Sequence, residues 1–195
     1  LAITFLILLG YPVPLTASQI IWLNLVTDGF LVIALALEPK EKDLLRGAWR
    51  LTKGFLVNLV SIERILLMGM VMTLGTIVLF DQYLSIAPEK ATTVALTTLS
   101  VFQWFNAWNC RSERVSIFVS RFRDNTFLVW ALAIVATLQL FALHAPFMQK
   151  VLHTVPLALA DWIVIIAAGL LIVMADELRK VVYRARLSTA PRRAE

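Results

Sequence analysis

Long apolar runs alternate with short polar stretches along the chain, and this alternation sets the predicted elements. Five runs have about the length that a membrane-spanning helix needs, roughly 20 residues. They are residues 17–36, 62–80, 91–109, 126–143 and 157–175. Residues 1–10 are apolar but too short to span, so we expect the end of a helix that begins upstream. Pro12 and Pro14 cannot continue that helix, and Thr16 or Ser18 can cap the next one, which predicts a helical hairpin.

Composition places the chain in the membrane. Of its 195 residues 59% are hydrophobic, and the mean hydropathy is +0.80, whereas an ordinary soluble domain is about 45–50% apolar. The single cysteine, Cys110, excludes an internal disulfide. The predicted fold is therefore all-α: a polytopic transmembrane bundle of six helices, the first one truncated. We expect residues 1–180 to form this membrane domain and residues 181–195 to form a basic cytoplasmic tail.

The basic residues gather on alternate loops. If successive helices cross the membrane in opposite directions, sixteen of the eighteen Lys and Arg residues lie on one side of the membrane and only Lys90 and Lys150 lie on the other. Cytoplasmic loops carry such an excess, so we expect loops 37–61 and 110–125 and the C-terminus to be cytoplasmic, most simply at a plasma (inner) membrane. The net charge of +5 is accounted for by this orientation, and we expect membrane lipid and no nucleic acid as a partner.

A polar cluster interrupts the second segment. Asn24, Thr27 and Asp28 follow the i, i+3, i+4 relation, so they share one face of a helix. A carboxylate at mid-membrane costs about 3 kcal/mol, which marks Asp28 as functional. Amide, hydroxyl and carboxylate oxygens suit a hard divalent cation, and Gly29 can interrupt the helix and free backbone carbonyls. The alternative is a face that bonds neighbouring helices together, which explains Asn24 and Thr27 but explains Asp28 poorly.

Other polar residues in the spans give weaker signals. Gln103 and Asn106, again at i, i+3, either complete a cation site or bond to a neighbouring helix, and the pattern does not decide between these. Gln139 has no polar neighbour at helical spacing and predicts a packing contact, while Asp161 is expected to be solvated near the outer boundary. The sequence has no phosphate-binding glycine loop and no nucleophile with a base, so we expect no hydrolysis by this chain alone.

Two motifs resemble one known family. The first resembles the fifth-to-sixth helix hairpin and sixth helix of P-type cation-transporting ATPases, with the calcium-pump branch as the nearest match. It consists of Pro14-Leu15-Thr16, Gln19 to Gly29 (QIIWLNLVTDG) and Ala34 to Pro39 (ALALEP). Phe102 to Asn109 (FQWFNAWN), followed by Arg111-Ser112-Glu113, resembles the end of that family's eighth helix. The topology extends the resemblance over the whole chain.

The resemblance implies a set of ligands. Asn24, Thr27 and Asp28 match the family's sixth-helix cation ligands, and Gln103 matches its eighth-helix ligand position, with Asn106 as possible further polar lining. The two-site calcium pumps have a glutamate where Gln103 stands, so the resemblance leans toward one-site pumps that carry Ca²⁺ and also accept Mn²⁺. Phe30-Leu31 replaces the family's leucine and proline, which implies a milder break in the helix.

The resemblance also implies partners that this chain does not contain. ATP and Mg²⁺ would act only in the intact parent protein, on its phosphorylation and nucleotide-binding domains. Loop 37–61 matches the loop that touches the phosphorylation domain, and the remaining transmembrane helices of the pump would complete the site. The competing hypothesis is a stand-alone polytopic membrane protein, either a small ion channel or carrier or a structural or regulatory subunit. An open reading frame that continues upstream into a D-K-T-G-T motif would separate the two.

Overall fold

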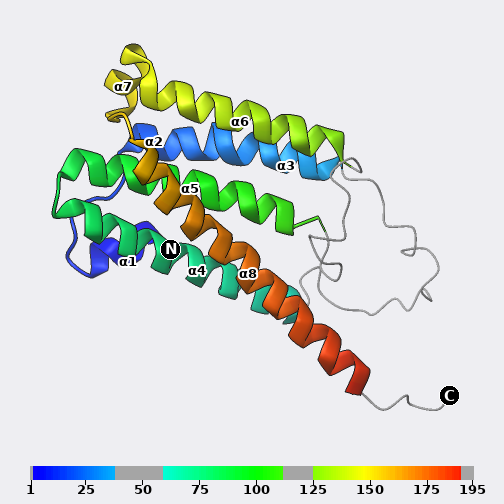
Figure 1. The fold of residues 1–195 in the computed structure, drawn as a ribbon. Coiled ribbons are helices and arrows are strands. Elements are labelled where there is room, and N and C mark those ends of the chain that lie inside the picture. The colour runs from blue at the N-terminus through cyan, green and yellow to red at the C-terminus, as the bar shows by residue number, and fades with distance from the viewer. Residues whose placement is uncertain (1, 38–58, 112–124, 190–195) are drawn as a thin grey trace.

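The structure is a computed structural model that describes residues 2–37, 59–111 and 125–189, and all regular elements in these ranges are helical (Figure 1). In chain order they are α1 (Ala2–Leu8), α2 (Ala17–Trp22), the π-helix η1 (Leu23–Asp28), α3 (Gly29–Ala36), α4 (Leu59–Leu84), α5 (Pro88–Asn109), α6 (Thr126–His144), α7 (Pro146–Leu152) and α8 (Leu159–Thr189). The all-α prediction is confirmed. Most of loops 37–61 and 110–125, and the end of the predicted tail 181–195, lie outside the described residues.

Four helical segments of the described chain are long and apolar enough to cross a membrane. They are Ala17–Ala36, Ser61–Leu84, Thr126–His144 and Leu159–Tyr183. Helix α5 has 22 residues and covers the predicted span 91–109, but it is less apolar than these four segments. Helix α8 continues to Thr189, well beyond residue 175, so the beginning of the predicted polar tail is helical. These segments make the chain an integral membrane protein.

The reversal between α1 and α2 forms as its residue types predict. Gly10 adopts a positive φ of 81° after α1, a conformation that glycine tolerates. Thr16 caps α2: the Gln19 backbone N–H donates to Thr16 Oγ1, and the Thr16 backbone N–H donates to Gln19 Oε1 at 3.0 Å. The buried Gln19 Nε2 also donates to the Leu152 carbonyl at 2.9 Å, which joins α2 to α7.

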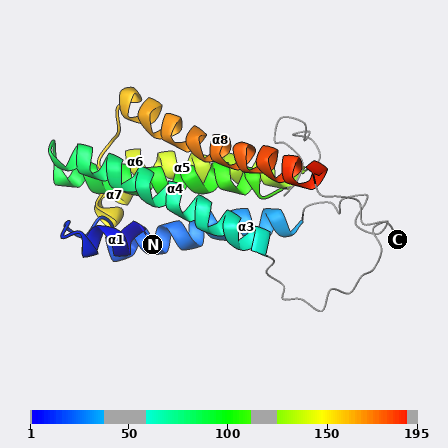
Figure 2. The same cartoon turned by 90° about the horizontal axis from the view of Figure 1, so that it is seen from below.

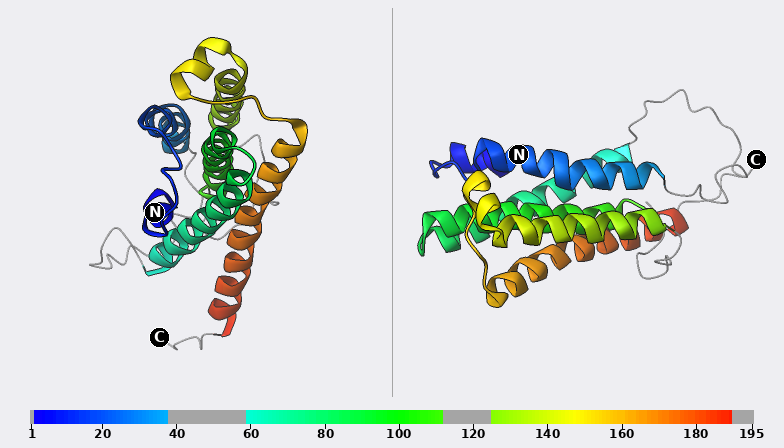
Figure 3. Two further views of the ribbon diagram at one scale, coloured as in Figure 1. Left: turned by 90° about the vertical axis from the view of Figure 1, so that its left-hand side faces the viewer. Right: turned by 90° about the horizontal axis from the view of Figure 1, so that it is seen from above.

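Helix α5 is the centre of the bundle. It packs against α4, α8, η1, α3 and α6, and α8 and the α2–η1–α3 segment lie on opposite sides of it (Figures 2 and 3). Two glycines permit the closest approaches: a Cβ at Gly75 of α4 would lie 2.6 Å from Phe102, and a Cβ at Gly169 of α8 would lie 2.6 Å from Phe105. Small residues at such crossings let the helices approach closely enough for dense packing in a membrane.

One polar residue in the bundle contradicts its prediction. Asp161 was expected to be solvated near the outer boundary, but it is only 5% exposed. Its carboxylate accepts from the Tyr83 hydroxyl at 2.8 Å and from the Ala158 backbone N–H at 2.8 Å, and Lys90 Nζ lies 2.9 Å away. The prediction was wrong because the turn between α4 and α5 brings Tyr83 and Lys90 to the start of α8, a contact that local spacing does not reveal.

Candidate cation site on the second segment

The predicted cluster lies in a π-helical turn. Over Leu23–Asp28 the hydrogen bonds widen, and the Gly29 N–H donates to the Asn24 carbonyl, five residues back. Such turns are rare and often mark functional sites. The interruption precedes Gly29 and does not arise from it, because Gly29 has ordinary helical angles (φ −56°, ψ −49°) and room for a Cβ, whose nearest neighbour would be the Asn24 carbonyl at 3.7 Å. The helix widens here without unwinding.

The three side chains of the cluster differ in burial. Thr27 is fully buried, and its Oγ1 has no hydrogen-bond partner. Asn24 and Asp28 are exposed, and neither side chain bonds to another helix within the described part of the chain. Within the described residues, no side-chain hydrogen bond supports the alternative in which this face joins helices to one another.

Helix α5 brings the second predicted pair next to this turn. Gln103 and Asn106 are half-buried on α5, which packs directly against η1 and α3. Gln103 Oε1 is buried without a hydrogen-bond partner. A buried polar atom left unpaired costs about 1–3 kcal/mol, so two such oxygens on packed elements, with Thr27 as the other, call for an explanation.

Side-chain hydrogen bonds anchor the segment that contains the π-turn, one just before the turn and one in α3 after it. Trp22, just before η1, donates its Nε1–H to Gln139 Oε1 at 3.0 Å, and Ser100 Oγ donates to the same oxygen at 3.3 Å. Gln139 is 1% exposed, so its predicted role as a packing contact is confirmed. Beyond the turn, the N-cap residue of α6, Asn125, donates from Nδ2 to the Ala34 carbonyl at 3.2 Å. These bonds fix η1 relative to α5 and α6.

The donor set is rich in neutral oxygens and poor in charge. Asp28 contributes the one carboxylate of the predicted ligands, and the others are amides and a hydroxyl. Among the described residues no three His, Cys, Asp or Glu side chains are grouped closely enough to hold a metal ion. Hard divalent cations take six to eight oxygens, usually with more than one carboxylate. The arrangement can supply part of such a coordination sphere, not all of it.

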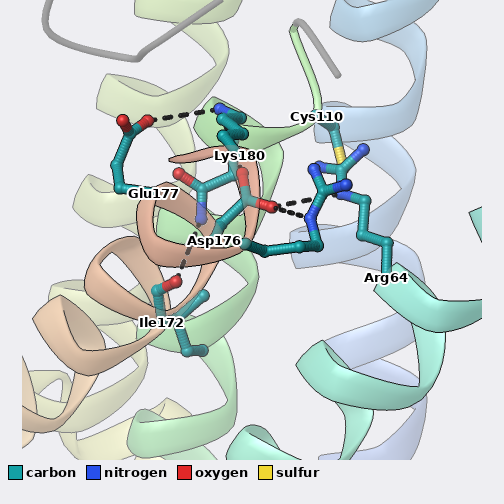
Figure 4. A network of polar contacts seen from close by, with 8 residues as sticks. Arg64, Cys110, Ile172, Asp176, Glu177 and Lys180 are labelled. Atoms are coloured by element: carbon teal, nitrogen blue, oxygen red, sulfur yellow. Dashed lines mark hydrogen bonds and ion pairs between the residues drawn. The ribbon is translucent and has the colours of Figure 1, made fainter. Parts of the chain in front are cut away.

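Sequence reasoning missed an ionic cluster at the opposite face of α5. Asp176, fully buried on α8, lies 3.6 Å from Arg64 Nε of α4, 2.9 Å from Arg179 Nε and 3.0 Å from Lys180 Nζ (Figure 4). Lys180 also donates to Glu177 at 3.3 Å. The i, i+4 spacing of Asp176 and Lys180 at the end of a span was the available signal. This cluster ties α4 to α8 and is structural.

A titratable pair stabilises the end of the bundle at the α1–α2 reversal. Tyr11 donates its hydroxyl to Asp81 Oδ1 at 2.9 Å. This hydrogen bond, followed by partial desolvation and the negative charge of Asp81, raises the pKa of Tyr11 above its ordinary value. The pair fixes the reversal against the end of α4 and contributes nothing to the candidate site.

Comparison with known proteins agrees with the motifs. The family described as "Cation transporting ATPase, C-terminus" matches residues 12–182. The calcium-transporting ATPase type 2C member 2 of Mus musculus is 32% identical over 183 residues, which cover 92% of this chain and 19% of that protein. The calcium-transporting ATPase of Bacillus subtilis (strain 168) is 31% identical over 169 residues, covering 85% of this chain and 19% of that protein. The type 2C member 1 protein of Homo sapiens is 29% identical over 181 residues (92% and 20%). The chain thus spans about a fifth of the length of these relatives.

Proposed function

Because the chain belongs to the family of cation-transporting ATPase C-terminal domains, we propose that it contributes cation-coordinating residues to the ATP-driven translocation of a divalent cation. Ca²⁺ is the proposed ion, as the printed names of the relatives suggest, and Mn²⁺ is the alternative because Gln103 is neutral. In this proposal the chain binds and releases the ion, while ATP and Mg²⁺ act on other domains of the parent pump.

The observation that carries the proposal is the π-turn with two unsatisfied buried oxygens, Thr27 Oγ1 and Gln103 Oε1, on packed elements. A bound cation would satisfy both oxygens. Asp28 would supply the charge, and Asn24 a neutral oxygen, on the exposed side of the same turn. Asn106 would line the site. Helices of the parent pump that cover this exposed side would add the missing carboxylates.

We propose that the parent pump uses the braced turn as a hinge. The turn is held at Trp22 and at Ala34 by bonds to Gln139 and Asn125, so a movement of neighbouring helices would strain the widened segment between these points. Such a movement would alter the distances among Asn24, Asp28 and their partners. The ion would then bind more tightly in one state than in the other, and this difference is what moves the equilibrium between inward and outward states.

The proposed topology has six membrane helices, the first truncated, with α5 as the polar central one. Arg64, Arg179 and Lys180 lie together at one end of the bundle, and Lys90 lies at the start of α5, close to the start of α8. The first end would be cytoplasmic, together with the C-terminus and loops 37–61 and 110–125, and a plasma (inner) membrane is the proposed location. Loop 37–61 would contact the phosphorylation domain.

Replacing the carboxylate tests the proposal. In the full-length protein Asp28→Asn keeps the size and hydrogen-bonding capacity of the side chain and removes its charge. We expect cation-dependent phosphorylation by ATP to be lost while membrane insertion is unchanged. Asp81→Asn is the matched control, because Asp81 bonds only to Tyr11 among the described contacts. If phosphorylation of the Asp28→Asn variant kept an unchanged dependence on Ca²⁺ and Mn²⁺ concentration, Asp28 would not be a cation ligand and the proposal would be wrong.

A further inference from the structure

A pocket of about 270 Å³ opens between α4 and α8, next to the Asp176 cluster. Its walls include Leu67, Ala175 and Val182, and Glu63, Arg179 and Tyr183 also line it. The spans to which it belongs begin at Ser61 on α4 and end at Tyr183 on α8. The pocket therefore lies where the hydrocarbon of a bilayer meets its headgroups.

The pocket lining carries both signs of charge. Glu63 and Arg179 line it, and next to it the buried Asp176 pairs with Arg64, Arg179 and Lys180. Asp176 and Glu177 are occupied by ion pairs. Glu63 is exposed, and among the described residues it has no hydrogen-bond or ion-pair partner. An unpaired carboxylate beside a guanidinium, above apolar walls, suits a ligand that carries both a cation and an anion.

A bare divalent cation fits the pocket less well. It would meet one carboxylate and the Arg179 guanidinium, so the pocket lacks the several oxygens that such a cation needs. The apolar walls suit a hydrocarbon chain, and the bilayer provides such chains at this depth.

We propose that the pocket binds a phospholipid with a primary-amine headgroup, such as phosphatidylethanolamine. One acyl chain lies between Leu67, Ala175 and Val182, the ammonium donates to the Glu63 carboxylate, and the phosphate lies beside Arg179 and Tyr183. A primary ammonium has three N–H donors, and the quaternary ammonium of phosphatidylcholine has none. The site therefore discriminates between these two lipids, and it does so independently of cation transport.

Native mass spectrometry of the purified, delipidated full-length protein tests this. Equal amounts of phosphatidylethanolamine, phosphatidylcholine and phosphatidylglycerol with identical acyl chains are added. We expect the first to be retained about fivefold over the second, the effect of one charge-assisted hydrogen bond at an exposed site. Glu63→Gln should reduce this ratio to about one. Ala175→Leu should fill the pocket and lower the retention of every lipid.

Two control variants match these changes. Glu89→Gln neutralises an exposed carboxylate in the first turn of α5, and Ala133→Leu enlarges an exposed residue of α6; neither should alter lipid retention. Equal retention of the amine and choline lipids by the unaltered protein overturns the proposal. So does a preference for phosphatidylglycerol, or an amine-lipid preference that survives Glu63→Gln. Glu63 is exposed and has no hydrogen-bond or ion-pair partner among the described residues, so we expect Glu63→Gln to fold like the unaltered protein.

Discussion

Neutralising Asp176 should destabilise the membrane bundle more than any other single change of one polar atom. Asp176 is fully buried and faces three cations, Arg64, Arg179 and Lys180. In Asp176→Asn the side chain keeps its size but loses its charge. Lys180 is only 1% exposed, and of its two ion pairs described above its ammonium would keep the weaker one, to Glu177 at 3.3 Å.

The magnitude follows from this burial. Removing one partner of a buried ion pair costs about 3–5 kcal/mol, because the other charge is left uncompensated in a low-dielectric environment. Replacing both partners with neutral groups is often close to neutral. The double variant Asp176→Asn/Lys180→Gln should therefore recover a large part of the loss. If Asp176 stabilised the bundle without interacting with Lys180, the losses of unfolding free energy in the two single variants would add up in the double variant instead.

Reversible unfolding of the full-length protein in mixed micelles, followed by circular dichroism, measures these free energies. Asp81→Asn is the control, since its carboxylate lies on an exposed surface and accepts one hydrogen bond from Tyr11; it should lose only a small fraction of what Asp176→Asn loses. A loss below about 1 kcal/mol for Asp176→Asn, the range of exposed ion pairs, would refute the reasoning. A double variant as unstable as the single variant would refute it equally.

Three further predictions use the same preparation. Gly169→Ala should cost about 1–3 kcal/mol of unfolding free energy, because its Cβ would overlap Phe105, whereas Gly29→Ala, which has room, should cost nothing measurable. Gln139→Leu should cost about 1–2 kcal/mol, since bonds between membrane helices average about 0.6 kcal/mol each and the donor of Trp22 loses its acceptor. Asp81→Asn should lower the pKa of Tyr11, seen by ultraviolet titration against Tyr11→Phe, because the carboxylate raises it. The raised pKa favours the protonated phenol in the folded state, so this hydrogen bond stabilises at neutral pH and is lost as the pH rises through the pKa of Tyr11.

The features that the sequence predicted well depend on short-range patterns. Residues 17–36 are both the predicted and the observed span, and α6 ends within one residue of its prediction, since helix length and apolar content decide them. The Thr16 cap depends on three neighbouring residues, and it formed. Gln139 was predicted to make a packing contact because it stands alone on its helix, and three helices meet at it.

The features that the sequence did not predict depend on contacts between distant segments. Asp161 is buried because Tyr83 and Lys90 reach it from another pair of helices. The helical spacing of Asn24, Thr27 and Asp28 does not predict the π-turn, nor that Thr27 is buried while the other two residues are exposed. The ligand roles of these residues and of Gln103 remain predictions that the Asp28 experiment decides.

Helix α5 shows why hydropathy alone does not identify a central membrane helix. Hydropathy reports on contact with lipid, yet α5 is enclosed by five other elements, so its polar residues need partners inside the protein and not an apolar surface. Several of its hydroxyls find them on the helix itself: Thr93 donates to the Glu89 carbonyl at 2.9 Å, Thr97 to the Thr93 carbonyl at 2.8 Å and Ser100 to the Leu96 carbonyl at 3.1 Å. A hydroxyl can bond back to its own helix in this way, but an amide oxygen cannot, because the backbone N–H groups of a helix interior are already used. Gln103 Oε1 is such an amide oxygen: like Asn109 Oδ1 on the same helix, it is buried without a hydrogen-bond partner, so a bond to it has to come from another segment or from outside the chain.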